Sequence, residues 1–232
     1  MKKVQAIPHP DQLRFAVLAA DTALFTIRGK DLCVRLTEVK RPPYFPDHEG
    51  LPGGLIHPKE TAGQAAVRHL EEKAGINAEK TYAEQLYTFS AIHRDPRGRV
   101  VAVAYLALVP WESLSPKEQT DGPHTWWTPV AQAHKLAYDH DDIVSLALSR
   151  LRSRITYTTL IGKLMPKEFT LTELEQAYES ILKTELDKRN FRKKILKLGI
   201  LEEVPRKKSG GRFRPAQLYR FVSTKVRDIE IL

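Results

Sequence analysis

The stretch GGLIHPKETAGQAAVRHLEEKAGI, residues 53–76, joins a glycine-rich loop to a strong helix start. Thr61 and Gln64 have the spacing of a capping box and Gly75 is a helix stop, so we predict a helix from Thr61 to about Lys73. Helical periodicity gathers its apolar residues on a packing face made of Ala66, Val67, Leu70 and Ala74. The opposite face is predicted to line a site and carries Gln64, Arg68, His69, Glu72 and Lys73.

Composition favours a globular chain with a polyanionic partner. The 232 residues, 42% of them apolar, suit two modest domains better than one large one, and the net charge of +9 favours nucleic acid or an acidic membrane surface. The single cysteine, Cys33, cannot form an internal disulfide, which indicates a reducing compartment. No segment approaches the roughly 20 apolar residues of a membrane span. We therefore expect a soluble cytoplasmic protein with no membrane partner.

Short apolar runs and turn sequences alternate over the first 156 residues, which indicates mixed strands with a few helices. Three strands are predicted at Arg14–Ala20, Leu24–Ile27 and Leu32–Thr37, separated by the turn-like segments DTA and RGKD. The run VVAVAYLALV, residues 100–109, is long and valine-rich enough for a central strand. TWWTPV, residues 125–130, predicts one more strand, and residues 139–155 an amphipathic helix.

The pattern becomes helical and basic near residues 157–166, where we place a domain boundary. Thr170 and Glu173 form a second capping box, and the helix that they start has an apolar stripe of Leu174, Ala177, Tyr178 and Ile181. Asp187 is a good N-cap for a second helix, Lys188–Leu198, which ends at Gly199 and turns Phe191, Ile195 and Leu198 inward. Residues 199–221 then predict a strand, a basic glycine-rich loop and a strand. This is the order of a winged helix-turn-helix.

Basic residues concentrate on the second helix and the wing, which predicts binding to double-stranded DNA. The alternative is an ordinary solvated charged face. Arg189, Asn190 and Arg192 are the candidates for base contacts, since Arg suits guanine and Asn suits adenine. The whole predicted DNA-binding set is Lys188, Arg189, Asn190, Arg192, Lys193, Lys197, Arg206, Lys207, Lys208, Arg212 and Arg214.

Residues 54–76 resemble the Nudix box. Seven positions match its pattern, and they are Gly54, Glu60, Arg68, Leu70, Glu72, Gly75 and Ile76. His69 and Lys73 stand where two glutamates of the family hold divalent cations for hydrolysis. The resemblance therefore implies a pocket that binds a diphosphate through cations without a metal, and a chain that is not an enzyme. The alternative is that Arg68 and Glu72 form an ordinary ion pair between successive helical turns.

The resemblance also implies a ligand related to ADP-ribose, because a basic segment and LPGG precede the box as they do in Nudix proteins that act on ADP-ribose. Arginines can clamp phosphates, and Phe45 or Tyr105 can stack on a ring. The turn DPRGR is alternatively a solvated β-turn. His57, His93, His134 and His140 have no metal-ligand spacing and are expected at the surface or in caps. The predicted ligand-binding set is Arg35, Lys40, Arg41, Phe45, Leu51, Gly53, Gly54, Arg68, Glu72, Lys73, Arg94, Asp95, Arg97 and Tyr105.

The whole chain resembles the Nudix-related transcriptional regulators. Membership implies an α+β protein in which a Nudix-like α/β/α sandwich with a mixed sheet, residues 1–156, precedes a winged helix-turn-helix domain, residues 157–232. It further implies a homodimer, an operator with two-fold symmetry, ADP-ribose or a related nucleotide as effector, control of NAD metabolism genes, and no required cofactor or metal. Two rivals remain at this point, an active Nudix ADP-ribose pyrophosphatase and a regulator that responds to a sugar.

Overall fold

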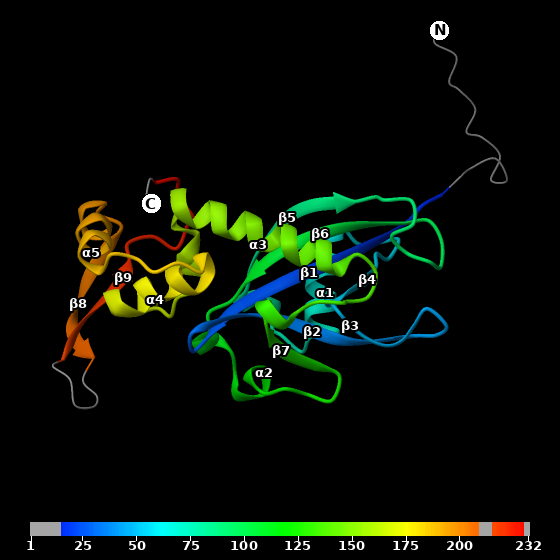
Figure 1. The fold of residues 1–232 in the computed structure, drawn as a ribbon, viewed down its shortest axis with the longest axis horizontal. Helices are drawn as coiled ribbons and strands as arrows, with labels where there is room; N and C mark the ends of the chain where they lie inside the picture. Colours follow the sequence, from blue (N-terminus) through cyan, green and yellow to red (C-terminus); the bar gives the residue numbers. More distant parts are fainter. Residues whose placement is uncertain (1–14, 209–214, 230–232) are drawn as a thin grey trace, which may run out of the picture.

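The computed structural model describes residues 15–208 and 215–229, which form a seven-stranded mixed sheet, a two-stranded sheet and their helices (Figure 1). The large sheet has the order β3-β2-β1-β6-β5, with β4 paired to β1 and β7 paired to β2. Its strands are β1 (Val17–Arg28), β2 (Asp31–Arg41), β3 (Phe45–Gly50), β4 (Gly53–Leu55), β5 (Tyr82–Phe89), β6 (Val100–Leu108) and β7 (Thr125–Pro129). The helices of this part are α1 (Ala62–Glu72), η2 (Ala78–Lys80), η3 (Trp111–Ser113), α2 (Pro116–Gln119), η4 (Val130–Gln132) and α3 (His140–Tyr157).

The central strand, β1, is one continuous strand where the sequence predicted two strands and a turn. β1 pairs antiparallel with β2 and parallel with β6, and the ladder to β6 runs without interruption from Val17 to Phe25. Residues 19–26 are all buried, so Asp21 and Thr22 lie inside the sheet and the prediction of a turn at DTA was wrong. The unbroken ladder satisfies the backbone groups that a turn would have exposed to water.

Two helices cover opposite faces of the large sheet. Neighbouring residues of β1 point to opposite faces, so Leu24 packs in one cluster with Leu70 of α1 while Phe25 packs in another with Ile143 of α3. Figure 1 shows α1 behind the sheet and α3 in front of it. The predicted α/β/α arrangement with a mixed sheet is confirmed.

The helix α1 has the predicted extent, but its buried face is rotated from the predicted one. The capping box of Thr61 and Gln64 is complete in both directions. Ala66 and Leu70 are buried as expected, whereas Val67 is exposed and His69 is buried. The reason is that β4 packs against this helix, and the ring of His69 fills the space left by Gly54.

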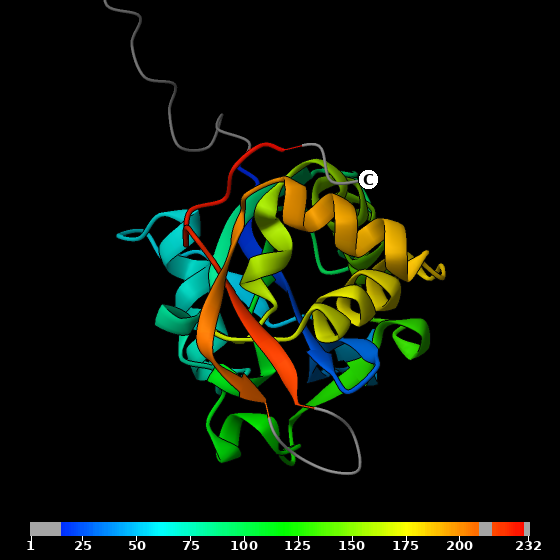
Figure 2. The same cartoon turned by 90° about the vertical axis from the view of Figure 1, so that its left-hand side faces the viewer.

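The C-terminal elements have the predicted winged helix-turn-helix order (Figure 2). Asp187 caps the second helix by accepting a hydrogen bond from the backbone N–H of Asn190, and Gly199 ends it with a φ of 62°. Residues 209–214, which include the predicted wing contacts Arg212 and Arg214, lie outside the described residues. The described elements are η5 (Thr159–Lys163), α4 (Leu171–Leu182), α5 (Lys188–Lys197), β8 (Leu201–Lys208) and β9 (Ala216–Phe221).

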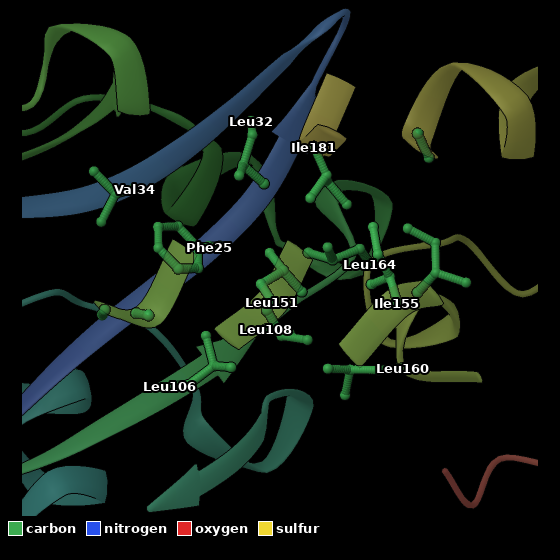
Figure 3. Packing of buried hydrophobic residues seen from close by; sticks show 14 of the residues in the cluster. Phe25, Leu32, Val34, Leu106, Leu108, Leu151, Ile155, Leu160, Leu164 and Ile181 are labelled. Atoms are coloured by element: carbon green, nitrogen blue, oxygen red, sulfur yellow. The ribbon is translucent and has the colours of Figure 1, made fainter. Parts of the chain in front are cut away.

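One hydrophobic core runs from the large sheet into the C-terminal elements. Figure 3 shows Phe25 and Leu106 of the sheet, Leu151 of α3, Leu160 of η5 and Ile181 of α4 in the same cluster. Because the stripe of α3 reaches from the sheet to α4, this helix is a packed connection between the two parts of the chain. Among the described residues no helix is both long and apolar enough to cross a membrane.

Candidate ligand pocket and nucleic-acid interface

A cavity of about 550 Å³ opens where β1, β2 and β4 meet the end of α1 and the start of α3. Most of the predicted ligand-binding residues line it, and they are Lys40, Arg41, Leu51, Gly53, Gly54, Glu72, Lys73, Arg94, Asp95 and Arg97. Several further residues that were not predicted from the sequence also line the cavity, and of these Asp21, Tyr138 and His140 matter most for its chemistry. The wall therefore carries cations and carboxylates together.

Arg35 was predicted to bind ligand but lies outside the cavity. Its side chain is 2% exposed, its Nε and Nη2 donate to the backbone oxygen of Ala74 at 3.3 and 3.2 Å, and its guanidinium lies over the Trp127 ring. Burial holds the pKa of Arg35 below its ordinary value, although Asp121 acts in the opposite direction. Arg35 thus secures the C-terminal end of α1.

Phe45 and Tyr105 are also outside the lining of the cavity. Phe45 packs on Tyr138 with ring centroids 4.5 Å apart, so it supports a lining residue from behind. Tyr105 packs against a small cluster that contains Ala20 and Ala65. Phe45 or Tyr105 was predicted to stack on a ring of the ligand, and here each ring packs against other side chains of the protein.

Arg68 holds the loop before α1 rather than lining the cavity. Its Nη2 donates to Glu60 Oε1 at 2.5 Å and to the Leu55 oxygen at 3.1 Å, and its Nη1 donates to Glu72 Oε2 at 3.2 Å. Hydrogen bonds from Arg68 lower the pKa of Glu60 to about 2. The ordinary ion pair between Arg68 and Glu72 on successive helical turns is present. It is part of a larger network that also includes Glu60 and the Leu55 oxygen.

The two positions that depart from the Nudix pattern are both engaged with β4. The side chain of Lys73 donates from Nζ to the Gly53 oxygen, and burial together with nearby Arg41 lowers its pKa. His69 is 4% exposed, its Nε2 lies 3.2 Å from the Leu55 oxygen, and burial lowers its pKa. A Cβ at Gly54 would lie 2.8 Å from His69 Cε1, so the backbone needs glycine there.

These residues do not fit a divalent cation. Glu72 is paired with Arg68, and Lys73, which follows it and lines the same cavity, adds a positive charge that disfavours a bound cation. Within residues 15–208 and 215–229 no group of three or more His, Cys, Asp or Glu side chains is arranged to hold a metal ion.

A buried charge network at the floor of the cavity was not foreseen. Arg94 donates from Nε to Asp139 Oδ2 at 2.8 Å, and from Nη2 to Asp139 Oδ1 at 2.5 Å and to Asp21 Oδ2 at 3.3 Å. Burial alone would raise the pKa of Asp21, but His140 and Arg94 bring it below the ordinary value. His140 is buried, so its expected place at the surface or in a cap was wrong. The only sequence feature that pointed to this network was Asp21, a carboxylate inside an apolar run.

The turn after Arg94 lies at the cavity wall. Asp95 is buried, and it accepts hydrogen bonds from the backbone N–H, the Nε and the Nη2 of Arg97. Burial alone would raise the pKa of Asp95, but these bonds lower it. The guanidinium of Arg97 also lies over the ring of Tyr138 at 5.1 Å. The turn thus forms part of the cavity wall, and the side chain of Arg97 in this wall is partly exposed.

The second candidate site is the basic surface of α5 and β8. Every predicted DNA-binding residue among the described residues is exposed there, and these are Lys188, Arg189, Asn190, Arg192, Lys193, Lys197, Arg206, Lys207 and Lys208. Phe191 and Ile195 are buried on the other side of α5, as the spacing predicted. The packing of α5 therefore turns its cations outward.

Some of these cations are paired with acidic residues that flank or belong to α4. Lys188 and Arg192 lie 3.7 and 3.8 Å from Glu175, and Arg206 pairs with Glu168. Lys208 donates to Glu173 Oε1 at 2.5 Å. Within the part of the chain that the structure describes, no ion pair involves Arg189, Lys193, Lys194, Lys197 or Lys207.

Comparison with known proteins agrees with this geometry. Residues 18–147 match the NUDIX domain family, and residues 161–221 match the family described as the NrtR DNA-binding winged helix domain. The chain is 37% identical over 209 residues to a protein of Acinetobacter baylyi named "ADPR responsive transcriptional repressor NtrR", covering 88% of this chain and 82% of the relative. The chain belongs to the NrtR family. Its predicted fold class and its kinship with Nudix-related regulators are confirmed.

A solved structure supports the NrtR assignment over most of the chain. Shewanella oneidensis NrtR in complex with a 27mer DNA superposes with a TM-score of 0.77 and 31% identity, covering 88% of this chain and 93% of that one. An ADP-ribose pyrophosphatase of Methanocaldococcus jannaschii is 30% identical over 144 residues, covering 62% of this chain and 76% of the relative. The two matched families leave residues 148–160 between them, so the boundary at residues 156 and 157 stays a prediction.

Proposed function

We propose that this protein is a transcriptional repressor of NAD metabolism genes, and that ADP-ribose in the cavity sets its affinity for operator DNA. The curated relative of this chain is named as a repressor that responds to ADP-ribose, and the Shewanella relative was solved with DNA. The observation that carries the proposal is the presence, on one chain, of the cationic cavity and the exposed basic helix α5. Such a protein acts where its DNA is, in the cytoplasm.

The cavity suits a diphosphate that is bound without a metal. Lys40, Arg41, Lys73 and Arg97 all line it and can donate charge-assisted hydrogen bonds to phosphate oxygens. The carboxylate of Glu72 is held by Arg68 on the same helix, as described above. A site of this kind retains its ligand instead of hydrolysing it, so no cofactor is required.

The basic surface suits a DNA duplex. In a winged helix-turn-helix the second helix enters the major groove, which gives α5 the base contacts and the β8–β9 wing the phosphates. We further propose a homodimer on an operator with two-fold symmetry. Exposed apolar surface at the start of the parallel strands supports the dimer, because Leu18 is 50% exposed there beside the half-buried Val101.

Fluorescence anisotropy with a labelled duplex from the upstream region of the protein's own gene cluster tests this function. We expect specific binding, and a several-fold change in the DNA Kd when ADP-ribose is added. NAD and arabinose serve as the other arms, since a response to the sugar alone would replace the effector. If none of the three changes the Kd of a specifically bound duplex, the proposed sensing function is wrong.

The rival function is hydrolysis, which the match to an ADP-ribose pyrophosphatase favours. Incubation of the protein with ADP-ribose and Mg²⁺ or Mn²⁺, followed by chromatography for AMP, measures it directly. We expect no turnover beyond the buffer blank, because the helix face has Lys73 where a cation would bind. Turnover of about 1 s⁻¹ or faster, which is ordinary for an enzyme, would mean that the chain is a hydrolase.

A further inference from the structure

The start of α3 lies in the wall of the ligand cavity, while the same helix extends into the core beneath the DNA-binding elements. His140, the first residue of α3, lines the cavity, and Asp139 immediately before it holds Arg94. Further along, Leu151 and Ile155 are buried in the cluster that contains Leu160 of η5. The 18 residues of α3 span about 27 Å, so one rigid element reaches from one site toward the other.

Asp139 occupies the N-cap position of α3 but does not cap the helix. An aspartate at an N-cap normally accepts a hydrogen bond from a backbone N–H of the first turn. Here no side-chain capping bond is formed, and both carboxylate oxygens accept from Arg94 instead. Asp139 therefore has two alternative partners, the guanidinium at the cavity and the backbone N–H of Asp141. Among the described residues that N–H makes no hydrogen bond, whereas those of His140, Asp142 and Ile143 are already bonded.

Arg94 is held so that one nitrogen remains for a ligand. Its side chain is 3% exposed, and its Nε and Nη2 are used by Asp139 and Asp21. Among the described residues Nη1 makes no hydrogen bond, and Arg94 lines the cavity. An anionic ligand group can accept from this nitrogen and draw the guanidinium away from Asp139.

His140 ties the same helix start to the loop that forms another wall. Its Nδ1 accepts the backbone N–H of Leu51 at 2.9 Å, so Nε2 carries the proton and faces Asp21 Oδ2 at 3.7 Å. A Cβ at Gly50 would lie 2.9 Å from the same Nδ1, which leaves the ring no room on that side. A shift of the first turn of α3 therefore changes the contact between His140 and Leu51, which both line the cavity.

We propose that Asp139 is a positioning residue that couples the occupancy of the cavity to α3, through exchange between Arg94 and the unbonded backbone N–H of Asp141 in its own helix. A ligand phosphate that binds Arg94 weakens the hydrogen bonds from Arg94 to Asp139. The released carboxylate of Asp139 then caps α3 and changes the position of the first turn of this helix. The change reaches the C-terminal elements because the apolar stripe of α3 packs into their core. This inference rests on the proposed function, since it explains how ADP-ribose alters DNA affinity.

The substitution Asp139→Asn tests the coupling. Asparagine is as good an N-cap as aspartate but lacks the charge that holds Arg94 bidentately. The matched control is Asp142→Asn, which removes the same charge from the first turn of α3 at an exposed position that does not line the cavity. The DNA Kd of each protein is measured with and without ADP-ribose at a concentration that saturates that protein, as found by calorimetry.

We expect the ratio of the two DNA Kd values to fall close to one in Asp139→Asn and to keep its wild-type value in Asp142→Asn. Both variants should still bind DNA and ADP-ribose. A wild-type ratio in Asp139→Asn would overturn the coupling while leaving the proposed function intact. A ratio of one in the wild-type protein would instead count against the proposed function.

Hydrogen exchange tests the coupling without DNA, and it distinguishes coupling through Asp139 from a purely structural role of this residue. ADP-ribose should protect the amide of Asp141 in the wild-type protein and in Asp142→Asn, because Asp139 then accepts from it. The protection should be absent or constant in Asp139→Asn, where the side chain caps the helix with or without ligand. Should Asp139→Asn fail to fold, Arg94→Lys serves instead, because it keeps the charge but cannot pair bidentately. Equal ligand-induced protection in the wild type and in the tested variant would overturn the exchange.

Discussion

Lys73 decides the chemistry of the cavity at the scale of a single residue. Its ammonium donates to Gly53 at the mouth of the loop, where a diphosphate oxygen can replace or join the carbonyl as acceptor. Replacing Lys73 with Gln keeps most of the length and removes the charge. We expect ADP-ribose to bind about ten-fold more weakly, since ten-fold corresponds to about 1.4 kcal/mol, close to one charged hydrogen bond.

Calorimetry in EDTA measures this effect and also tests whether binding needs a metal. The matched control is Lys59→Gln, an exposed lysine in the loop before α1 that does not line the cavity. Lys59→Gln should bind as the wild type does. Binding that disappears in EDTA, or that is unaffected by Lys73→Gln, would contradict metal-free recognition by this residue.

Glu118 gives a stability prediction that depends on pH. Its carboxylate accepts from the backbone N–H groups of Asn77 and Ser115 at 2.8 and 2.6 Å and from Lys80 Nζ at 2.9 Å. Burial alone would raise its pKa, but these bonds lower it to about 2 from the ordinary 4.5. Because the unfolded chain takes up this proton first, the contribution is complete above pH 4.5 and is lost as pH falls toward 2.

We therefore expect Glu118→Gln to lower the free energy of unfolding by about 2 kcal/mol at pH 7, and by less as the pH falls through that window. Urea unfolding of both proteins across the pH range measures the gap. Glu112→Gln, an exposed glutamate in the neighbouring η3, should leave the free energy nearly unchanged. A gap that stays constant down to pH 2 would show that folding does not lower the pKa of this carboxyl group.

At the scale of elements, what could be predicted from sequence was local. The capping box of Thr61 and Gln64 and the cap at Asp187 involve residues within one turn, so their helices were placed correctly. The continuity of β1 was missed because it depends on pairing with β6, about 80 residues away. Asp21 and His140 were missed for the same reason, since only the folded sheet brings them together.

The wing of the DNA-binding domain can be tested through Lys207 on β8. Lys208 is held by Glu173, whereas no ion pair within the described residues involves Lys207, so Lys207 is the better phosphate contact. We expect Lys207→Ala to weaken binding to all duplexes alike and to reduce the slope of log Kd against log salt by about 1. Lys117→Ala on α2 removes the same charge away from the wing and should change neither quantity. An unchanged slope in Lys207→Ala would show that this lysine does not touch phosphate.

For the whole molecule, the continuous core gives the proposed coupling of the two sites a physical path. The sequence predicts two domains, but the hydrophobic cluster that includes Phe25, Leu151 and Tyr178 crosses the predicted boundary. Local patterns cannot reveal such a core, because members such as Phe25 and Tyr178 are more than 150 residues apart. A ligand that shifts α3 therefore has to act on both parts.

Reciprocity then follows without any assumption about the path of the coupling. If ADP-ribose changes the DNA Kd by a given factor, specific DNA must change the ADP-ribose Kd by the same factor. We expect titration of ADP-ribose into the free protein and into the protein saturated with its operator duplex to give Kd values whose ratio equals that factor. A duplex of scrambled sequence is the control and should leave the ADP-ribose Kd nearly unchanged. Unequal factors would mean that the ligand changes the number of protein chains on the duplex, so that its effect on DNA arises from assembly and not from a shift of α3 within one chain.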